Sequence, residues 1–167
     1  MIRMRILRSM LVLLTVAPAA AAAQQPDPLA PVLFLVGRWD GEATSTYGSY
    51  RYHNEVVRRG NWLLGTGEAH TDQPGAAPII TTTVMGRDDA GHLVLYLFDA
   101  GGMWQFAGTT DSAGVTFVWR EGGAFRRTHL TPLPDGSVRQ ETVAHLPDQQ
   151  PPLPKDVTAE SIQHPAP

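Results

Sequence analysis

The segment GHLVLYLFDAGGMWQFAGTTDSAGVTFVWREGGAFRRTHL, residues 91–130, is built from four short runs rich in β-branched and aromatic residues. The runs are separated by AGG at 100–102, DSAG at 111–114 and EGGA at 121–124. Gly and Asp at such places supply the positive φ angles and side-chain hydrogen bonds that tight hairpins require. The segment therefore predicts four antiparallel strands, each joined to the next by a short turn.

The same pattern extends in both directions from this segment. DDAG at 88–91 and PDG at 134–136 mark further turns, and no window of about 11 residues shows a helical period. A long meander closes on itself because closure removes exposed strand edges. We therefore expect an all-β fold, a single antiparallel meander β-barrel of about 8–10 strands. The strands are expected near 38–47, 50–59, 61–70, 78–87, 91–99, 102–110, 114–121, 124–131 and 136–146.

The first 23 residues have the pattern of a secretory signal peptide. Arg3, Arg5 and Arg8 precede an apolar run at 11–16, and the alanines at 19–23 end in a small-residue cleavage site. The apolar run is shorter than the roughly 20 residues that a membrane span needs. We expect a cleaved signal peptide at 1–23, export to the periplasm or the extracellular space, and no transmembrane segment in the mature protein.

The rest of the chain divides into three parts. QQPDPLAP at 24–31 is broken by prolines and is expected to be a flexible lead-in. The barrel domain is expected at 32–146, beginning with a short helical turn near 32–36. Residues 147–167 contain too many prolines for a central strand, so we expect a Pro-rich C-terminal tail there.

Composition excludes several classes of function. The 167-residue chain has no cysteine, which removes disulfide scaffolds, thiolate metal sites and Cys nucleophiles. It has 13 Lys and Arg against 16 Asp and Glu, and loss of the three signal-peptide arginines leaves 10 against 16. An acidic chain without a basic run has no electrostatic basis for binding phosphate backbones. We therefore expect no nucleic-acid partner.

The hairpin register predicts an aromatic wall inside the barrel. A two-residue turn at 100–101 places Leu97 opposite Trp104, and the side-chain period of two then fixes which residues share a face. The opposite face, which carries Val94, Tyr96 and Phe98, is less polar than a solvated face should be. The face with the larger aromatic load is expected to be the interior, with Leu93, Leu95, Leu97, Trp104, Phe106, Phe117 and Trp119.

The next two turns bring polar residues to the same interior. The register across 122–123 pairs Trp119 with Arg126, and the register across 134–137 pairs Arg126 with His145. One apolar wall and one polar wall are typical of a cavity for a small ligand, because a buried charge needs a partner or water. The ligand-binding residues predicted in this way are Trp104, Phe106, Phe117, Trp119, Arg126, Glu141 and His145.

A different turn length would change this assignment. A bulge or a longer turn shifts the parity of every following residue, and Phe125, Arg127, His129 and Ala144 would then face inward. The Arg, Glu and His side chains would in that case form a solvated outer face.

The start of the barrel region resembles the opening of calycin-type barrels, the superfamily of lipocalins and fatty-acid-binding proteins. FLVGRWDGE at 34–42 places Gly37 and Trp39 on a first strand that follows a short helical turn. The resemblance implies that Gly37 and Trp39 are structural, with Trp39 plugging one barrel end. Arg139 is the candidate to stack on the Trp39 ring.

The sequence shows two further resemblances. VMGRD at 84–88 and LFDAGG at 97–102 are similar to a subgroup of secreted bacterial barrels of unassigned function. WDGE at 39–42 resembles in part the opening strand of nitrobindin-type haem barrels, in which a His near the last strand ligates the iron. This second resemblance makes His145 the candidate iron ligand of an alternative, haem-binding function.

The predicted interior favours a protein that binds a small apolar or amphiphilic ligand. The sequence contains no Gly-x-Ser-x-Gly, no phosphate-binding Gly-rich loop and no His-Glu-x-x-His. We therefore assign no catalytic residue, no metal and no cofactor. Besides haem binding, two alternatives remain: an enzyme that uses Glu141 and His145 as an acid/base pair, and a structural module whose barrel is filled by side chains.

Overall fold

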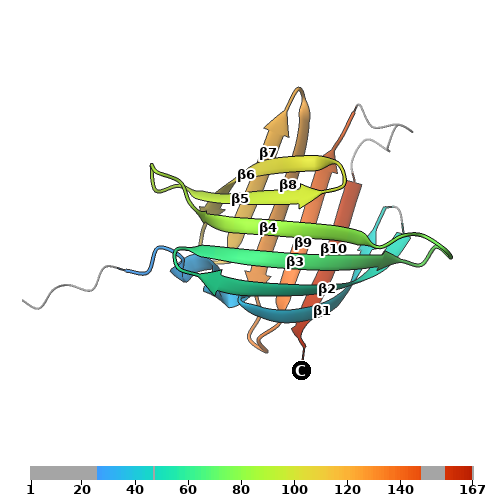
Figure 1. The fold of residues 1–167 in the computed structure, drawn as a ribbon, viewed down its shortest axis with the longest axis horizontal. Coiled ribbons are helices and arrows are strands. Elements are labelled where there is room, and N and C mark those ends of the chain that lie inside the picture. The colour runs from blue at the N-terminus through green and yellow to red at the C-terminus, as the bar shows by residue number, and fades with distance from the viewer. Residues whose placement is uncertain (1–25, 47, 148–156, 167) are drawn as a thin grey trace, which may run out of the picture.

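The computed structural model describes residues 26–46, 48–147 and 157–166, and it contains one 3-10 helix and ten strands (Figure 1). The strands form a closed barrel in which every strand pairs with its two neighbours. The elements are η1 (Ala30–Leu35), β1 (Gly37–Ser45), β2 (Gly48–Arg59), β3 (Trp62–Thr71), β4 (Ile79–Arg87), β5 (Leu93–Asp99), β6 (Gly102–Thr110), β7 (Val115–Glu121), β8 (Ala124–Pro132), β9 (Val138–His145) and β10 (Val157–Pro165).

The predicted fold class is confirmed. All ladders are antiparallel, consecutive strands pair in a meander, and β1 pairs with β10 to close the sheet. The predicted helical turn is η1, which begins next to Pro31 and ends before β1. Closure satisfies the backbone groups that an open sheet would expose at its edges.

The prediction of a tail from residue 147 onward was wrong for 157–165. These residues form β10, which pairs Ser161 with Ala43 on β1 and with Gln140 on β9. The prolines that suggested a tail precede this strand, and within it Pro165 lies only at the last position. Proline lacks the backbone N–H that donates to a neighbouring strand. At a strand end this loss affects only the last position of the ladder, so proline is tolerated there. The prolines from 151 to 154 lie outside the described residues.

The structure tests only part of the predictions for the N-terminal region. The predicted signal peptide lies outside the described residues. Within the predicted flexible lead-in, Leu29 is fully buried and Asp27 forms an ion pair with Arg58, so this part of the segment is docked on the barrel. The physical reason is apolar burial: Leu29 and Val32 cover the end of the core, and leaving them in water would cost about 1.5–3 kcal/mol each.

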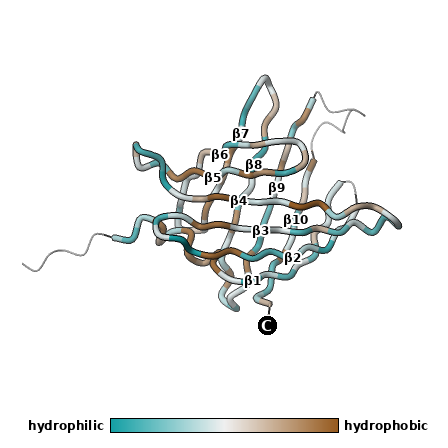
Figure 2. Tube along the Cα trace, viewed as in Figure 1, coloured by the Kyte–Doolittle hydropathy of each residue, from teal (hydrophilic) through white to brown (hydrophobic). Residues whose placement is uncertain are grey.

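The aromatic interior has the predicted register. Leu97 pairs with Trp104 and Gly108 pairs with Phe117. Phe106 and Phe117 are buried with 2% and 0% of their surface exposed. Figure 2 shows brown, hydrophobic stretches on β3, β4 and β5, which contribute to this core. The buried cluster consists of Leu29, Val32, Leu35, Trp39, Leu63, Met85, Leu93, Phe106, Val115, Phe117, Leu130 and Val138.

The register between β8 and β9 differs by one residue from the predicted register. Trp119 pairs with Arg126 as predicted, but Arg126 pairs with Ala144 instead of His145. Pro132 and Val138 form the last pair, so the loop between them has five residues, 133–137. The Leu133 and Gly136 amides donate to loop carbonyls at 2.8 and 3.0 Å, which fixes that length. An odd loop moves every side chain of β9 to the other face.

Candidate ligand-binding site

The barrel is hollow, with an interior cavity of about 600 Å³. Small-molecule pockets typically measure about 300–1,000 Å³, so the space suits one small ligand. The cavity excludes the alternative of a barrel filled by side chains. Its apolar lining comes mostly from β4 to β7 and its polar lining mostly from β2 and β8 to β10. Lining residues include Trp39, Tyr50, Asn54, Val56, Met85, Leu95, Leu97, Asp99, Phe106, Phe117, Arg126, Thr128, Leu130, Gln140, Thr142, Ala144 and Gln163.

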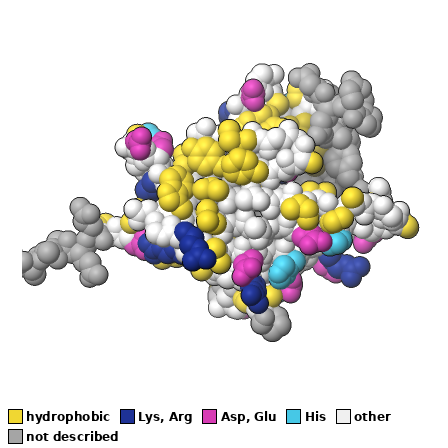
Figure 3. Space-filling model, in the orientation of Figure 1, with side chains coloured by type: hydrophobic (Ala, Val, Ile, Leu, Met, Phe, Trp, Pro, Cys, Tyr) yellow, Lys and Arg dark blue, Asp and Glu magenta, His cyan; other side chains and the backbone are white. Residues whose placement is uncertain are grey.

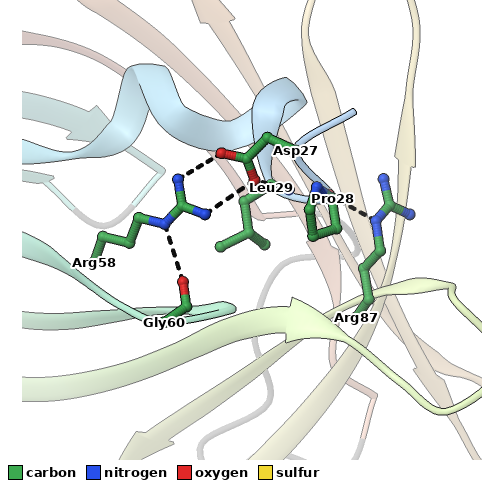
Figure 4. Close-up of polar contacts among 6 residues, drawn as sticks. All are labelled: Asp27, Pro28, Leu29, Arg58, Gly60 and Arg87. Carbon is green, nitrogen blue, oxygen red and sulfur yellow. Dashed lines mark hydrogen bonds and ion pairs between the residues drawn. The ribbon is translucent and has the colours of Figure 1, made fainter. Parts of the chain in front are cut away.

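The N-terminal segment covers one end of the cavity, since Leu29 and Val32 belong to the buried core and Leu35 lines the cavity. Figure 4 shows the polar contacts that hold this segment. Arg58 donates from Nη2 to Oδ1 of Asp27 at 3.0 Å, and Arg87 donates from Nε to the Pro28 carbonyl at 2.7 Å. The Arg58 guanidinium, with the Leu29 amide, holds the pKa of Asp27 below its ordinary value. Two arginines from different strands therefore attach this segment to the barrel rim.

Trp39 lies under the closed end, as the calycin resemblance implied. Its side chain is 6% exposed, and its indole N–H donates to the Leu35 carbonyl at 2.8 Å. Gly37, two residues earlier, has a φ of +148° beside the Trp39 ring. The assignment of Arg139 to that ring was wrong. Arg139 lies on the outer face, where its Nε is 3.9 Å from a carboxylate oxygen of Glu160, because the parity of β9 is reversed.

Arg126 brings a positive charge into the cavity. It lies on β8 with its guanidinium carbon 6.0 Å from the centre of the Phe106 ring. Burial lowers the pKa of Arg126, while the fields of Tyr50 and Asp99 oppose that shift. Among the described residues its guanidinium has no hydrogen bond and no carboxylate within ion-pair distance. The charge is therefore stabilised only by an aromatic face and by groups farther away.

The Asp99 carboxylate near this cation is already engaged. Its Oδ1 accepts from the Gly101 amide at 2.8 Å and from the Trp104 indole N–H at 3.2 Å. Burial also raises the pKa of Tyr50, so the phenol beside Arg126 is neutral at ordinary pH. This end of the cavity thus keeps one positive charge whose hydrogen-bond donors are unused.

The four predicted aromatic residues all face the interior, with different surroundings. Phe106 and Phe117 line the cavity. Trp104 and Trp119 pack against the core as an edge-to-face pair, with ring centroids 4.8 Å apart at 82°. Such pairs add about 0.5–1.5 kcal/mol to the burial of their area. The pair therefore stiffens the wall that holds Phe106 and Arg126.

Glu141 and His145 were wrongly placed in the interior. Glu141 is exposed and pairs with His129 across the outer face, and the ring of His145 stacks on Phe125 at 6.1 Å. The five-residue loop before β9 is the cause, since a four-residue loop would have brought both side chains inward. The proposed acid/base pair is therefore absent from the cavity.

The alternative register that sequence analysis left open is also only partly right. Ala144 does line the cavity, but Phe125, Arg127 and His129 face outward because β8 keeps its original parity. His129 accepts or donates a hydrogen bond with the Thr116 hydroxyl at 2.8 Å on that face. The shift affects one strand and leaves Arg126 inside.

The haem alternative loses its predicted iron ligand. None of the six histidines in the sequence lines the cavity, and His145 points away from it. Other pairs of an acid and a histidine also lie on the outer face, including Asp40 with His53 at 2.6 Å. Among the described residues no group of three His, Cys, Asp or Glu side chains is arranged to hold a metal ion.

Sequence reasoning missed most of the polar lining. Gln140 and Thr142 replace the predicted Glu141 on β9, and Gln163 comes from the unrecognised β10. Gln163 donates to Gln140 at 3.1 Å, so these two amides form part of one wall. The alternation in VTAESIQH at 157–164, with smaller residues at 157, 159 and 161, was the available signal for an inward face.

The fold and the cavity define a hollow, ten-stranded antiparallel meander barrel, an architecture that fits calycin-like barrels in general. No family model matches the chain, and no curated protein matches it. Among solved structures, it is similar to a redesigned beta barrel, mFAP0, bound to DFHBI, with a TM-score of 0.42 and 11% sequence identity. The match covers 78% of this chain and 99% of that chain. No helix in the described ranges is long and apolar enough to cross a membrane.

Proposed function

We propose that this protein is an exported binding protein that holds a small amphiphilic ligand in its barrel, with an anionic group of the ligand on Arg126. The observation that carries the proposal is the unpaired guanidinium of Arg126 inside a hollow, mostly apolar space. A buried charge without an ion partner is costly, so a protein retains one where a ligand supplies the partner. A carboxylate is well matched, because guanidinium donors bind it in a bidentate way.

The position of Arg126 sets the orientation of the ligand. Arg126 lies near the start of β8, on the side of the barrel where Asp99 and Tyr50 also lie. Leu35, Trp39 and Met85 line the opposite, closed end. We expect the anionic group at Arg126 and the apolar part of the ligand directed toward Trp39, where burial contributes about 25 cal/mol per Å².

The test compares two ligands of equal length and different charge. Decanoate and decanol are titrated into the purified protein while tryptophan fluorescence is followed, since Trp39 lines the cavity and Trp104 lies beside Asp99. We expect decanoate to bind about tenfold or more tightly, because a hydrogen bond to a charged group contributes about 1.5–3 kcal/mol. Arg126→Gln should remove that preference and leave decanol binding nearly unchanged.

Arg127 provides the matched control. It is the next residue on β8, exposed on the outer face, so Arg127→Gln makes the same change outside the cavity. Its decanoate affinity should equal that of the parent. Equal binding of decanoate and decanol by the parent protein would contradict the anionic class, and no response to either compound would contradict the binding function.

Export is tested separately. We expect the full-length chain, expressed in a bacterium with its own N-terminus, to be recovered from the periplasm or medium without residues 1–23. Mass spectrometry of the recovered protein measures the cleavage. An intact N-terminus on cytoplasmic protein would contradict this part of the proposal.

A further inference from the structure

The cavity wall has a recess where β3 crosses it. Gly65 and Gly67 occupy inward positions of β3 and line the cavity without side chains. Gly67 pairs with Asn54 on β2 and with Thr81 on β4. Both side chains lie over this glycine: a Cβ atom at residue 67 would be 2.5 Å from Oδ1 of Asn54 and 2.7 Å from Oγ1 of Thr81. Only a residue without a side chain leaves room for the two.

Thr83 repeats this arrangement one inward position further along β4. It pairs with Gly65, and its hydroxyl lies where a side chain at residue 65 would stand. Asn54, Thr81 and Thr83 thus bring one amide and two hydroxyls to the same part of the cavity wall. We call this group of three side chains the polar recess.

The polar recess has no hydrogen-bond partners within the part of the chain that the structure describes. No hydrogen bond joins the side chains of Asn54, Thr81 or Thr83 to another residue there. Elsewhere on the cavity wall polar side chains pair with one another, as Gln163 does when it donates to Gln140 at 3.1 Å. Enclosed polar groups are almost always hydrogen-bonded, so groups without a protein partner bond to water or to a ligand.

The placement of polar residues on β4 is the reverse of what burial favours. Thr81 and Thr83 line the cavity, whereas Ile80, on the outer face, is 55% exposed. Figure 3 shows hydrophobic side chains exposed on the outer surface of the barrel. A strand with one face in water normally has its apolar residues inside and its polar residues outside. The inward threonines therefore indicate a role for hydroxyl groups in the cavity.

The polar recess lies far from the guanidinium of Arg126. Tyr50, the phenol beside Arg126, and Asn54 are four residues apart on the inward face of β2, which is about 13 Å along the strand. On its other side Asn54 pairs with Trp39, near the closed end of the cavity. A ligand whose anionic group lies on Arg126 reaches the recess with its opposite end.

We propose that the polar recess binds a hydroxyl group at the end of the ligand remote from its anionic group. This inference rests on the proposed function and narrows the ligand class to hydroxylated amphiphilic acids. A ligand hydroxyl donates one hydrogen bond and accepts others, which matches the carbonyl and amino groups of Asn54 and the hydroxyls of Thr81 and Thr83. The apolar wall then faces the hydrocarbon between the two polar ends.

The test compares 10-hydroxydecanoate with decanoate, which differ only in the hydroxyl at the end opposite the carboxylate. Both are titrated into the purified protein, and tryptophan fluorescence measures the two affinities. We expect 10-hydroxydecanoate to bind about three- to tenfold more tightly, because an intramolecular-type hydrogen bond between neutral groups has a net favourable contribution. In a cavity without polar partners the same hydroxyl would weaken binding, since its transfer out of water is unfavourable.

Replacing the threonines by valine removes the hydroxyls and keeps the shape of the side chains. The double variant Thr81→Val, Thr83→Val should lose the preference for 10-hydroxydecanoate and bind decanoate within about twofold of the parent. Thr82→Val is the matched control, because Thr82 lies between the two on the exposed outer face of β4, and it should keep the preference. Circular dichroism melts confirm that each variant is folded. Thr81→Val alone, which should reduce the preference, serves if the double variant is not.

Two results would overturn the inference. One is a parent protein that binds 10-hydroxydecanoate no more tightly than decanoate, which would leave the recess to water. The other is a preference that persists in the folded double variant. Both leave the proposed function intact as long as decanoate binds through Arg126. No response to decanoate, in contrast, would contradict the proposed function itself, and the inference with it.

Discussion

Phe125 and His145 lie opposite each other on β8 and β9, with their rings stacked at an interplanar angle of 22° on the outside of the barrel. The next pair along the ladder is Arg126 with Ala144, and both of these residues face the cavity. The small Ala144 side chain leaves room beside the guanidinium. The same register thus places His145 on the outer face and leaves open space in the cavity beside Arg126.

This arrangement predicts that His145 is dispensable for ligand binding. His145→Ala should leave the affinity for decanoate within about twofold of the parent, whereas Arg126→Gln should weaken it about tenfold or more. The same fluorescence titration measures both variants. Hemin added to the parent should give no Soret shift that His145→Ala abolishes, because the imidazole cannot reach the cavity. A Soret band lost in that variant would contradict the observed register.

Nine of the ten strands could be predicted from the sequence because each is bounded by a local turn signal. Pairs such as Leu97 with Trp104 followed from two-residue turns, where loop length and register are tied together. The candidate site was harder because its polar wall depends on the loop at 133–137. LPDGS can form a four-residue or a five-residue connection, and its composition does not show which of the two its internal backbone hydrogen bonds will form.

The tenth strand was hidden by a different effect. Its pairing with β1 joins residues more than a hundred positions apart, such as Ser45 and Ala159, and no local pattern reports such a contact. The prolines before it argued for a tail. Besides the alternation in VTAESIQH at 157–164, the need of β1 for a second neighbour, which follows from closure, was the argument for a strand at 157–165.

The N-terminal attachment makes stability depend on pH through Asp27. The pKa of Asp27 in the folded protein lies below its ordinary value of 3.8, chiefly because of Arg58. A carboxyl with a depressed folded pKa stabilises the protein above its unfolded pKa, and this contribution is lost as the pH falls through the folded pKa. Asp27→Asn should therefore lower the melting temperature at pH 7, and the difference from the parent should shrink below about pH 3.8.

Arg58→Gln supplies the control for that measurement. In this background the Asp27 carboxylate has lost its main partner, so Asp27→Asn should change the melting temperature much less. Differential scanning calorimetry from pH 7 downward measures all four proteins. A difference between parent and Asp27→Asn that stays constant through the acid range would contradict the role of the ion pair.

Trp39 should contribute more to stability than any exposed apolar residue. Trp39→Ala leaves a void in the core and should cost about 3–5 kcal/mol of unfolding free energy. Trp39→Phe keeps much of the volume but leaves the Leu35 carbonyl without its donor, which should cost about 1–3 kcal/mol. Denaturant unfolding measures both, with Ile162→Ala as an exposed control. A loss below about 1 kcal/mol for Trp39→Ala would contradict the plug.

The last prediction concerns β10. Removing this strand tests whether it is needed to close the barrel or is a dispensable tail. A chain that ends at Pro147 loses the ladders to β1 and β9 together, which leaves two unpaired edges and exposes the side of the cavity that Gln163 lines. We expect this chain to lose the dispersed amide NMR spectrum of the parent and to aggregate, since long unpaired edges pair with one another.

A synthetic peptide of residues 157–167, added during refolding, should restore part of the dispersed spectrum. The same peptide with Ser161→Pro should not restore it, because Ser161 is buried in the middle of the strand between Ala43 and Gln140. A truncated chain that folds and melts like the parent would show that nine strands suffice to hold the barrel.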